Sequence, residues 1–144
     1  MSALKVLIID DNPHARRIAR AIVAGMEDAE VFECADPKAA MDLSTVWKCD
    51  VALVDYEMPS MNGVAFTRLV RSGATPFLRE LPIIMMTGHA DKEHVIEARD
   101  AGVNGFIAKP LSVGMVIGQI GRTMAAASGA PAPAPAKAAN STWL

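Results

Sequence analysis

The sequence lacks an excess of positive charge. Its 144 residues carry 14 Lys and Arg against 16 Asp and Glu, which gives a formal net charge of -2. A protein that binds nucleic acid directly needs surplus cations to neutralise backbone phosphates, and this chain has none. We therefore expect no direct contact with nucleic acid. The length allows one packed core and is short for two, so it predicts one globular domain.

The chain also lacks a long apolar run and is poor in cysteine. The N-terminal segment MSALKVLIID has a lysine and stops at an acid pair, which is typical of neither a signal peptide nor a transmembrane span. We therefore expect a cytoplasmic protein with no membrane contact. Cys34 and Cys49 have no Cys-x-x-Cys spacing and no histidine at metal-ligand spacing, so we assign them no chemistry.

What the sequence does contain is a series of short apolar runs, typical of parallel strands that helices cover on both faces. Such runs occupy residues 6–9, 51–54 and 83–86, with a weaker one at 105–108. The run at 31–34 includes a charged residue, which favours a strand at the edge of the sheet.

Helical segments separate these runs. Asn12-Pro13 and Asp36-Pro37 each combine a capping side chain with a proline at the first helical position. Apolar residues that we expect to dock the first helix on the sheet recur at helical spacing: Ala15, Ile18, Ala19, Ile22, Val23 and Met26. Further helices are predicted at residues 63–72, 91–101 and 112–126. Five strands alternating with five helices predict a doubly wound α/β fold, a five-stranded parallel sheet with flavodoxin-like order 2-1-3-4-5 and helices on both faces.

Polar residues stand where these predicted strands end. Asp10 and Asp11 follow the first strand, Asp55 the third, Thr87 the fourth and Lys109 the fifth. Ligands of open α/β sheets bind at this edge, and neighbouring strands lie only about 4.8 Å apart. Three carboxylates pressed into one cleft require a cation, and Mg²⁺ is the hard cation that prefers such oxygens and also binds phosphate.

A carboxylate beside Mg²⁺ can attack a phosphoryl group and form an acyl phosphate. The metal and Lys109 would neutralise the transferring oxygens, and the Thr87 hydroxyl would donate a hydrogen bond to one of them. The polar edge is therefore suited to phosphoryl transfer.

Four motifs, in this order and spacing, make residues 4–126 resemble the receiver domains of bacterial response regulators, most closely the single-domain chemotaxis type. They are Ile8-Ile9-Asp10-Asp11-Asn12, Val54-Asp55-Tyr56-Glu57-Met58-Pro59, Met86-Thr87-Gly88-His89 and Phe106-Ile107-Ala108-Lys109-Pro110.

The resemblance implies that Asp55 is the phosphoacceptor. Asp11, Asp55 and the backbone carbonyl of Glu57 would bind Mg²⁺ directly, and Asp10 would reach the metal through water. Lys109 would bind a phosphoryl oxygen, and the peptide bond before Pro110 would be cis.

The resemblance also implies a switch made by Thr87 and Phe106. The phosphoryl group would draw the Thr87 hydroxyl inward, and the Phe106 ring would turn in and remodel the face of the fourth helix, fifth strand and fifth helix. Glu57 and His89 would tune how fast water removes the phosphoryl group, although both are equally typical of solvated loop residues. The predicted helix at 91–101 has a poor apolar stripe, which favours a movable segment.

The expected partners are a histidine kinase or histidine phosphotransfer protein, which donates the phosphoryl group, and a downstream protein on the switched face. The chain would catalyse only its own phosphorylation and dephosphorylation. Residues 1–126 would form the receiver domain, and the Ala/Pro-rich residues 127–144 a disordered tail with no output domain. Output would therefore be protein binding.

Other functions fit less well. A phosphatase of the haloacid dehalogenase type needs Asp-x-Asp after the first strand, where this chain has adjacent acids. A flavin phosphate would be repelled by the same acids. A phosphorylation-independent interaction module on the same fold stays as an alternative.

Glycines in the predicted last helix leave a question open. Gly114, Gly118 and Gly121 each cost up to about 1 kcal/mol relative to alanine in a helix interior. Either the helix packs closely on the sheet, or it offers a smooth outer surface to a partner.

Overall fold

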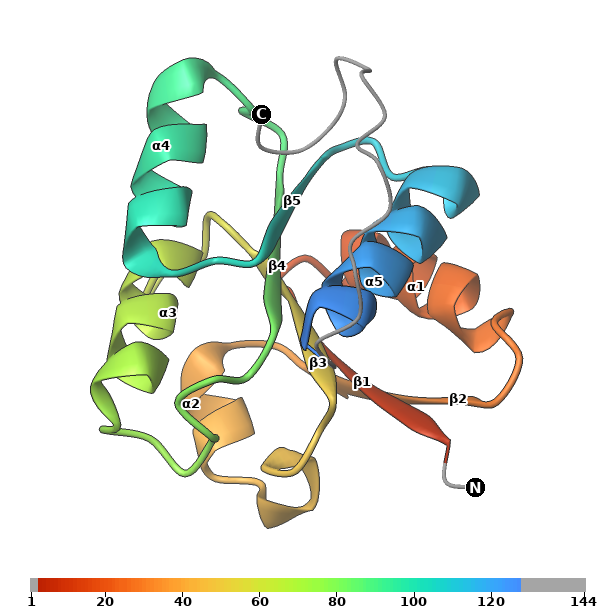
Figure 1. The fold of residues 1–144 in the computed structure, drawn as a ribbon, viewed down its shortest axis with the longest axis horizontal. Coiled ribbons are helices and arrows are strands. Elements are labelled where there is room, and N and C mark those ends of the chain that lie inside the picture. Colours follow the sequence, from red (N-terminus) through yellow and green to blue (C-terminus); the bar gives the residue numbers. More distant parts are fainter. Residues whose placement is uncertain (1–2, 128–144) are drawn as a thin grey trace.

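The structure, a computed structural model, describes residues 3–127 as one five-stranded parallel sheet with helices on both faces (Figure 1). The strands pair in the order β2-β1-β3-β4-β5, so the predicted doubly wound fold and strand order are confirmed. The strands are β1 Leu4–Ile9, β2 Ala29–Cys34, β3 Val51–Asp55, β4 Ile83–Thr87 and β5 Gly105–Ala108. As predicted, β2 lies at an edge.

The helices lie close to their predicted positions. They are α1 Pro13–Ala24, α2 Pro37–Met41, a short 3₁₀ turn η1 Ser44–Val46, α3 Gly63–Ser72, α4 Lys92–Ala101 and α5 Val113–Ala127. Helix α4 begins one residue later than predicted because Asp91 is its cap, and α5 ends one residue later at Ala127. The rest of the predicted tail lies outside the described residues.

Side-chain caps fix where the helices after β1, β2, β3 and β4 begin. The Asn12 side-chain oxygen accepts hydrogen bonds from the backbone N–H groups of His14 and Ala15, at 2.9 and 3.0 Å. Asp36, Asn62 and Asp91 each accept a hydrogen bond from the residue three positions later, at 2.8 to 2.9 Å. Each cap satisfies a backbone donor that the first helical turn leaves unpaired. The caps thus place helix starts just beyond the carboxyl ends of the strands.

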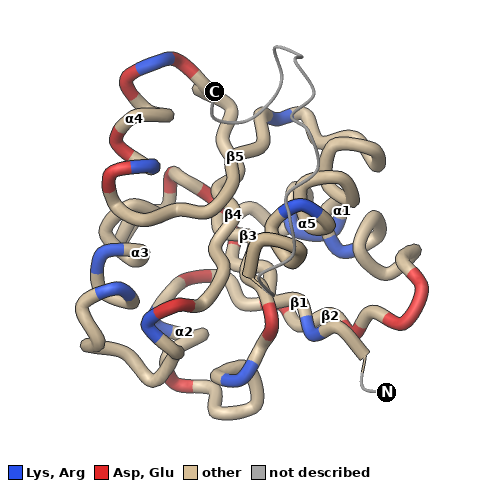
Figure 2. Tube along the Cα trace, viewed as in Figure 1, with Lys and Arg blue, Asp and Glu red and all other residues tan. Residues whose placement is uncertain are grey.

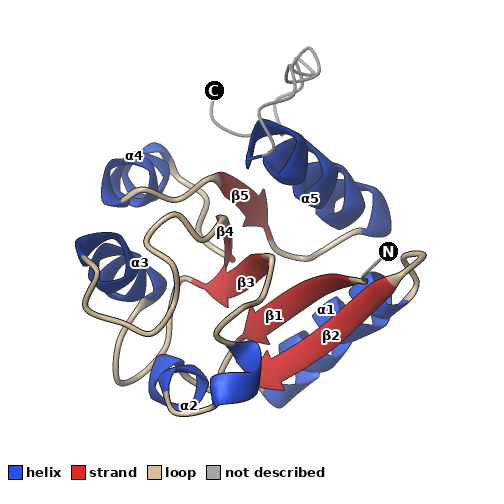
Figure 3. Cartoon of the chain, turned by 60° about the horizontal axis from the view of Figure 1, so that its bottom comes forward, coloured by secondary structure: helices blue, strands red, loops and turns tan. Residues whose placement is uncertain are grey.

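Helices α1 and α5 cover one face of the sheet and α2, α3 and α4 the other (Figure 3), and an apolar core lies on each face. One joins the strands to α1 and α5, with Ala19, Val23, Val116 and Ile120 as buried helix residues. The other joins the strands to α2, α3 and α4. This two-sided burial explains the continuous apolar runs of β1, β3 and β4. In α1, Ile18 is 41% exposed, so the prediction that it docks on the sheet is wrong.

Helix α4 buries few of its residues. Only Ala98 and Ala101 of its ten residues are buried, and Val95 packs partly against the core. Its C-terminal end is held by Arg71 of α3, whose guanidinium donates hydrogen bonds to the Gly102 carbonyl at 2.8 and 3.1 Å. The small buried area agrees with the predicted poor apolar stripe.

The glycines of α5 face outward. A Cβ atom built on Gly114 or Gly121 would meet nothing within 4 Å, and one on Gly118 would meet only the Arg122 guanidinium, at 3.4 Å or more. Close packing of these glycines on the sheet is therefore excluded, and docking of a partner on this outer surface stays a prediction. Tight packing occurs instead at Gly105 of β5, where an added Cβ would overlap the Gln119 side chain.

Replacing Gly121 by alanine should therefore stabilise the protein, by about 0.5 to 1 kcal/mol, because alanine reduces the freedom of the unfolded chain and meets no neighbour. Gly105→Ala is the matched control and should destabilise it, because its Cβ would displace Gln119. Urea unfolding measures both. A loss of stability in Gly121→Ala would show that this glycine is packed against the fold.

Candidate functional site

The predicted site residues come together at one edge of the sheet. Asp55 and Thr87 are the last residues of β3 and β4, Asp10 directly follows β1, and Lys109 directly follows β5. The strands are parallel and paired in near register, so all four ends lie along the same edge. The backbone N–H of Lys109 donates to the Thr87 carbonyl at 2.7 Å, which extends the β4–β5 ladder to the lysine.

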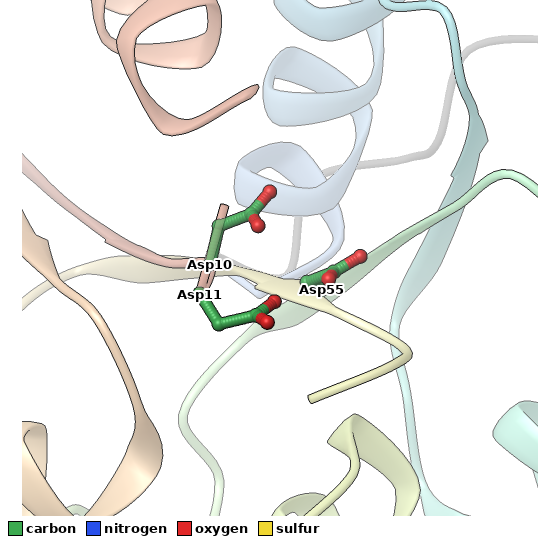
Figure 4. A group of neighbouring side chains, drawn as sticks. All are labelled: Asp10, Asp11 and Asp55. Atoms are coloured by element: carbon green, nitrogen blue, oxygen red, sulfur yellow. The ribbon is translucent and has the colours of Figure 1, made fainter. Parts of the chain in front are cut away.

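Three carboxylates form the centre of the site. One oxygen from each of Asp10, Asp11 and Asp55 lies within 4.8 Å of the others (Figure 4). Asp10 is fully buried, Asp55 is 7% exposed and Asp11 is exposed, so the cluster has a closed side and an open side. Crowded hard oxygen ligands with access from solvent fit Mg²⁺, which uses one or two carboxylates and keeps several waters.

Backbone contacts hold Asp10 in place. One of its side-chain oxygens, Oδ1, accepts a hydrogen bond from the Asn12 N–H at 3.0 Å. Its carbonyl accepts a hydrogen bond from Arg16 Nη1 at 2.7 Å. Arg16 was not predicted to have a role, although its position one turn into α1 places it over the end of β1.

Lys109 bridges two of the carboxylates. Its Nζ lies 3.1 Å from Asp10 Oδ2 and 3.1 Å from Asp55 Oδ1. Burial alone would lower the pKa of Lys109, but the hydrogen bonds and charges of Asp55 and Asp10 raise it above the usual value. The peptide bond between Lys109 and Pro110 is cis, as predicted.

The pKa of the Asp55 carboxyl is raised above its usual value. Burial, followed by repulsion from Asp10, raises its pKa from 3.8 to about 6, and this happens despite the opposing hydrogen bond and charge of Lys109. One lysine therefore does not offset the crowding of acids. A divalent cation at the cluster would favour the ionised, nucleophilic form of Asp55.

The residues predicted to form the switch lie next to this edge. Thr87 is 1% exposed, and its hydroxyl accepts a hydrogen bond from the His89 N–H at 3.0 Å. Phe106 is 7% exposed and belongs to the core on the α2, α3 and α4 face. The Phe106 side chain therefore packs in this core, next to the strand end that carries Thr87.

Glu57 and His89 form a solvent-exposed pair. His89 Nε2 lies 3.8 Å from Glu57 Oε1, and both side chains are 62% exposed. They connect the loop after β3 to the loop after β4. The sequence predicts them only as two separate loop positions and gives no signal for the pair.

Two further neighbours of Asp55 were not singled out from the sequence. A Cβ on Gly63 would lie 2.6 Å from the Asp55 carbonyl oxygen, so only glycine allows α3 to start this close to the acceptor. The Tyr56 hydroxyl makes a hydrogen bond to the Glu97 carboxylate of α4. The Asn62-Gly63 pair before an apolar helix was the available signal for the first, whereas nothing local indicates the second.

The fold and the site together define a class of protein, a doubly wound α/β domain with an aspartate cluster and a lysine at the carboxyl ends of its strands. Residues 6–120 match the model of the response regulator receiver domain, and the chain belongs to this family.

Relatives with known names agree with this assignment. The chain is 34% identical over 109 residues to the chemotaxis protein CheY of Pseudomonas aeruginosa, a match that covers 76% of this chain and 86% of that protein. It is 36% identical over 110 residues to a CheY homologue of Campylobacter jejuni, covering 76% and 83%.

Solved structures show the same fold. The chemotaxis protein CheY4 of Vibrio cholerae superposes with a TM-score of 0.73 at 28% identity, covering 85% of this chain and 99% of that one. A CheY-like receiver domain protein of Methanospirillum hungatei gives a TM-score of 0.74 at 22% identity, covering 89% and 98%.

The predicted function is therefore confirmed at the level of the family, a phosphorelay signalling switch and not an enzyme with a turnover substrate. The phosphatase and flavin-binding alternatives are not favoured. Within residues 3–127, no helix has the length and apolar content needed to cross a membrane.

Replacing Asp55 by asparagine should stabilise the metal-free protein at pH 7 by about 1 to 2 kcal/mol, because it removes a carboxylate that the folded state disfavours. The folded pKa of about 6 lies above the usual 3.8, so the folded state binds the proton more tightly. Wild-type stability should then fall as pH rises from about 4 to about 6 and stay low above that.

Urea unfolding in a chelator, from pH 4 to 8, tests this expectation. The advantage of Asp55→Asn should vanish near pH 4, and Mg²⁺ should stabilise the wild type more than the variant. A variant that is no more stable than the wild type at pH 7 would show that the acids do not repel one another as described.

Proposed function

We propose that Asp55 accepts a phosphoryl group from a histidine kinase or histidine phosphotransfer protein, and that this modification changes which protein the chain binds. The observation that carries the proposal is the joint position of Asp55, two further carboxylates and Lys109 at one edge of the sheet. We place this activity in the cytoplasm and assign it to the receiver domain predicted at residues 1–126, whose last helix extends to Ala127.

The transfer needs no other nucleophile. A carboxylate oxygen of Asp55 attacks phosphorus, and the phosphorus–nitrogen bond of the donor's phosphohistidine breaks with its electron pair returning to the imidazole, which takes up a proton. Asp11, Asp55 and the Glu57 carbonyl would hold Mg²⁺ directly and Asp10 through water, and the bound ion would supply positive charge beside the phosphoryl oxygens.

Lys109 changes partners during this step. Its ammonium now donates to Asp55 Oδ1, and it would turn to a phosphoryl oxygen once Asp55 carries the acyl phosphate. Asp10 stays within reach and keeps the lysine at the edge of the sheet. The chain would also catalyse its own dephosphorylation, in which water attacks phosphorus and Asp55 leaves as a carboxylate.

Glu57 and His89 are suited to set the rate of that hydrolysis. Their side chains are exposed and pair across the loops that follow β3 and β4. A carboxylate and an imidazole at this position can orient or obstruct the attacking water. Their proposed role is therefore to set the phosphoryl lifetime.

The output surface is the face of α4, β5 and α5. Thr87 would rotate its hydroxyl from the His89 N–H toward the phosphoryl group, and the volume it leaves would be taken by Phe106. Helix α4 carries charges of both signs, whereas α5 has Arg122 as its only charged residue (Figure 2). The open glycines of α5, beside the exposed Val113 and Ile117, give a target helix room to approach closely.

The direct test is intact-protein mass spectrometry with acetyl phosphate and Mg²⁺. The wild type should gain the mass of one phosphoryl group, and peptide mapping should place it on Asp55. Asp55→Asn should gain none, and omitting Mg²⁺ should suppress the gain. Modification of another residue, or no modification with either acetyl phosphate or a kinase, would contradict the proposal.

Thr87→Ala should separate chemistry from switching. Because Thr87 only donates a hydrogen bond, the variant should still accept a phosphoryl group on Asp55. It should lose most of the change in amide hydrogen exchange that the phosphoryl mimic beryllofluoride, with Mg²⁺, produces across α4, β5 and α5. An undiminished change in the variant would remove Thr87 from the switch.

A further inference from the structure

Tyr56 ties the acceptor loop to α4. It directly follows Asp55, and its side chain is 7% exposed within the core on the α2, α3 and α4 face. Its hydroxyl makes a hydrogen bond to the Glu97 carboxylate, on the middle of α4. Burial and then the contact with Glu97 raise the pKa of Tyr56 to about 12, so the phenol stays protonated and donates.

His94 contacts the same ring from the same helix. The His94 and Tyr56 ring centroids lie 4.8 Å apart with an interplanar angle of 70°. His94 Nδ1 lies 2.7 Å from Oδ1 of Asp91, which is the N-terminal capping residue of α4. His94 and Glu97 are three residues apart and therefore share one face of the helix. His94 thus contacts the ring of Tyr56, and Glu97 accepts the hydrogen bond of its hydroxyl.

The backbone of Tyr56 has little freedom of its own. Its N–H donates to the Met86 carbonyl of β4 at 2.8 Å, and its carbonyl accepts from the Gly63 N–H of α3 at 2.9 Å. A displacement of α4 that pulls on the ring is thus transmitted to the peptide between Asp55 and Glu57. These are the acceptor and the proposed carbonyl ligand of the metal.

This contact matters because α4 buries little apolar surface. Its buried side chains are two alanines, which contribute little apolar area. A hydrogen bond between a buried phenol and a carboxylate is among the stronger polar contacts in proteins. It therefore adds to the contacts of Arg71 and of the buried alanines in fixing α4 in the observed position.

We propose that Tyr56, His94 and Glu97 form a latch that couples the position of α4 to the phosphoacceptor loop. The proposal rests on the proposed function, because coupling matters only if Asp55 is modified. Coupling between two sites is reciprocal for binding equilibria. A target that displaces α4 and opens the latch should therefore change the affinity of the Asp55 site for a phosphoryl mimic.

Amide hydrogen exchange of α4 tests the latch, with and without Mg²⁺ and beryllofluoride. In the free protein, Tyr56→Phe and Glu97→Ala should each raise exchange across residues 92–101 about five- to tenfold. The double variant should add little to either single change, because both remove the same contact. The shift produced by the mimic should shrink in all three variants.

Glu93→Ala is the matched control, since it removes the same charge from an exposed position one turn earlier in α4 and should leave exchange within about twofold of the wild type. Glu97→Gln should restore part of the protection, because its amide oxygen still accepts a hydrogen bond. Glu97 is on the surface, so its variants test the latch even if Tyr56→Phe folds poorly.

Mass spectrometry of the same samples keeps two failures apart. Normal phosphorylation of Asp55 with α4 exchange that is unchanged in the variants, or additive in the double variant, overturns the latch alone. A wild type that gains no phosphoryl mass overturns the proposed function and the coupling with it.

Discussion

Crowding of negative charge at the carboxyl ends of β1 and β3 is the constraint on which the rest of this structure depends. One carboxylate oxygen from each of Asp10, Asp11 and Asp55 lies within 4.8 Å of the others, and the pairing of Ile9 with Val54 holds the backbones of Asp10 and Asp55 side by side. Lys109 compensates in part through its contacts at 3.1 Å to Asp10 and Asp55. The remaining repulsion disfavours the ionised form of Asp55 when no cation is bound. A bound cation would favour the ionised form, which is the nucleophile.

The central strands of the fold are much more deeply buried than helix α4, which is a suitable arrangement for a switch. The strands of the centre are buried on both faces, so the acceptor, its neighbouring acids and the lysine sit on a rigid frame. Around that frame, α4 buries two alanines and α5 presents open glycines to solvent. Under the proposed function, a change at Asp55 would therefore move α4 without disturbing the core that positions the chemistry.

Much of the fold could be predicted because its signals are local. Asn12-Pro13 and Asp36-Pro37 marked helix starts through capping, and uninterrupted apolar runs marked strands covered on two faces. The convergence of Asp10, Asp55 and Lys109 followed from parallel topology alone. Ile18 was misjudged because helical spacing identifies a stripe but not its limits, and Ile18 lies beyond the edge of the buried part.

Contacts between distant segments could not be predicted in this way. Tyr56 and Glu97 are 41 residues apart, and nothing in either neighbourhood indicates that they meet. The direction of the α5 glycines was equally ambiguous, since a helix with few polar residues has two similar faces until the sheet selects one. The pairing of His89 with Glu57 depends on the shape of two loops, which no periodicity describes.

The central claim is that a cation makes the acidic cluster tolerable, and the ionisation of Asp55 reports on it directly. An NMR titration of the ¹³C-labelled side-chain carboxyl of Asp55 should give a pKa of about 6 in metal-free buffer, and Mg²⁺ should lower it below the usual 3.8. A carboxyl that titrates near 3.8 in both conditions would contradict the claim.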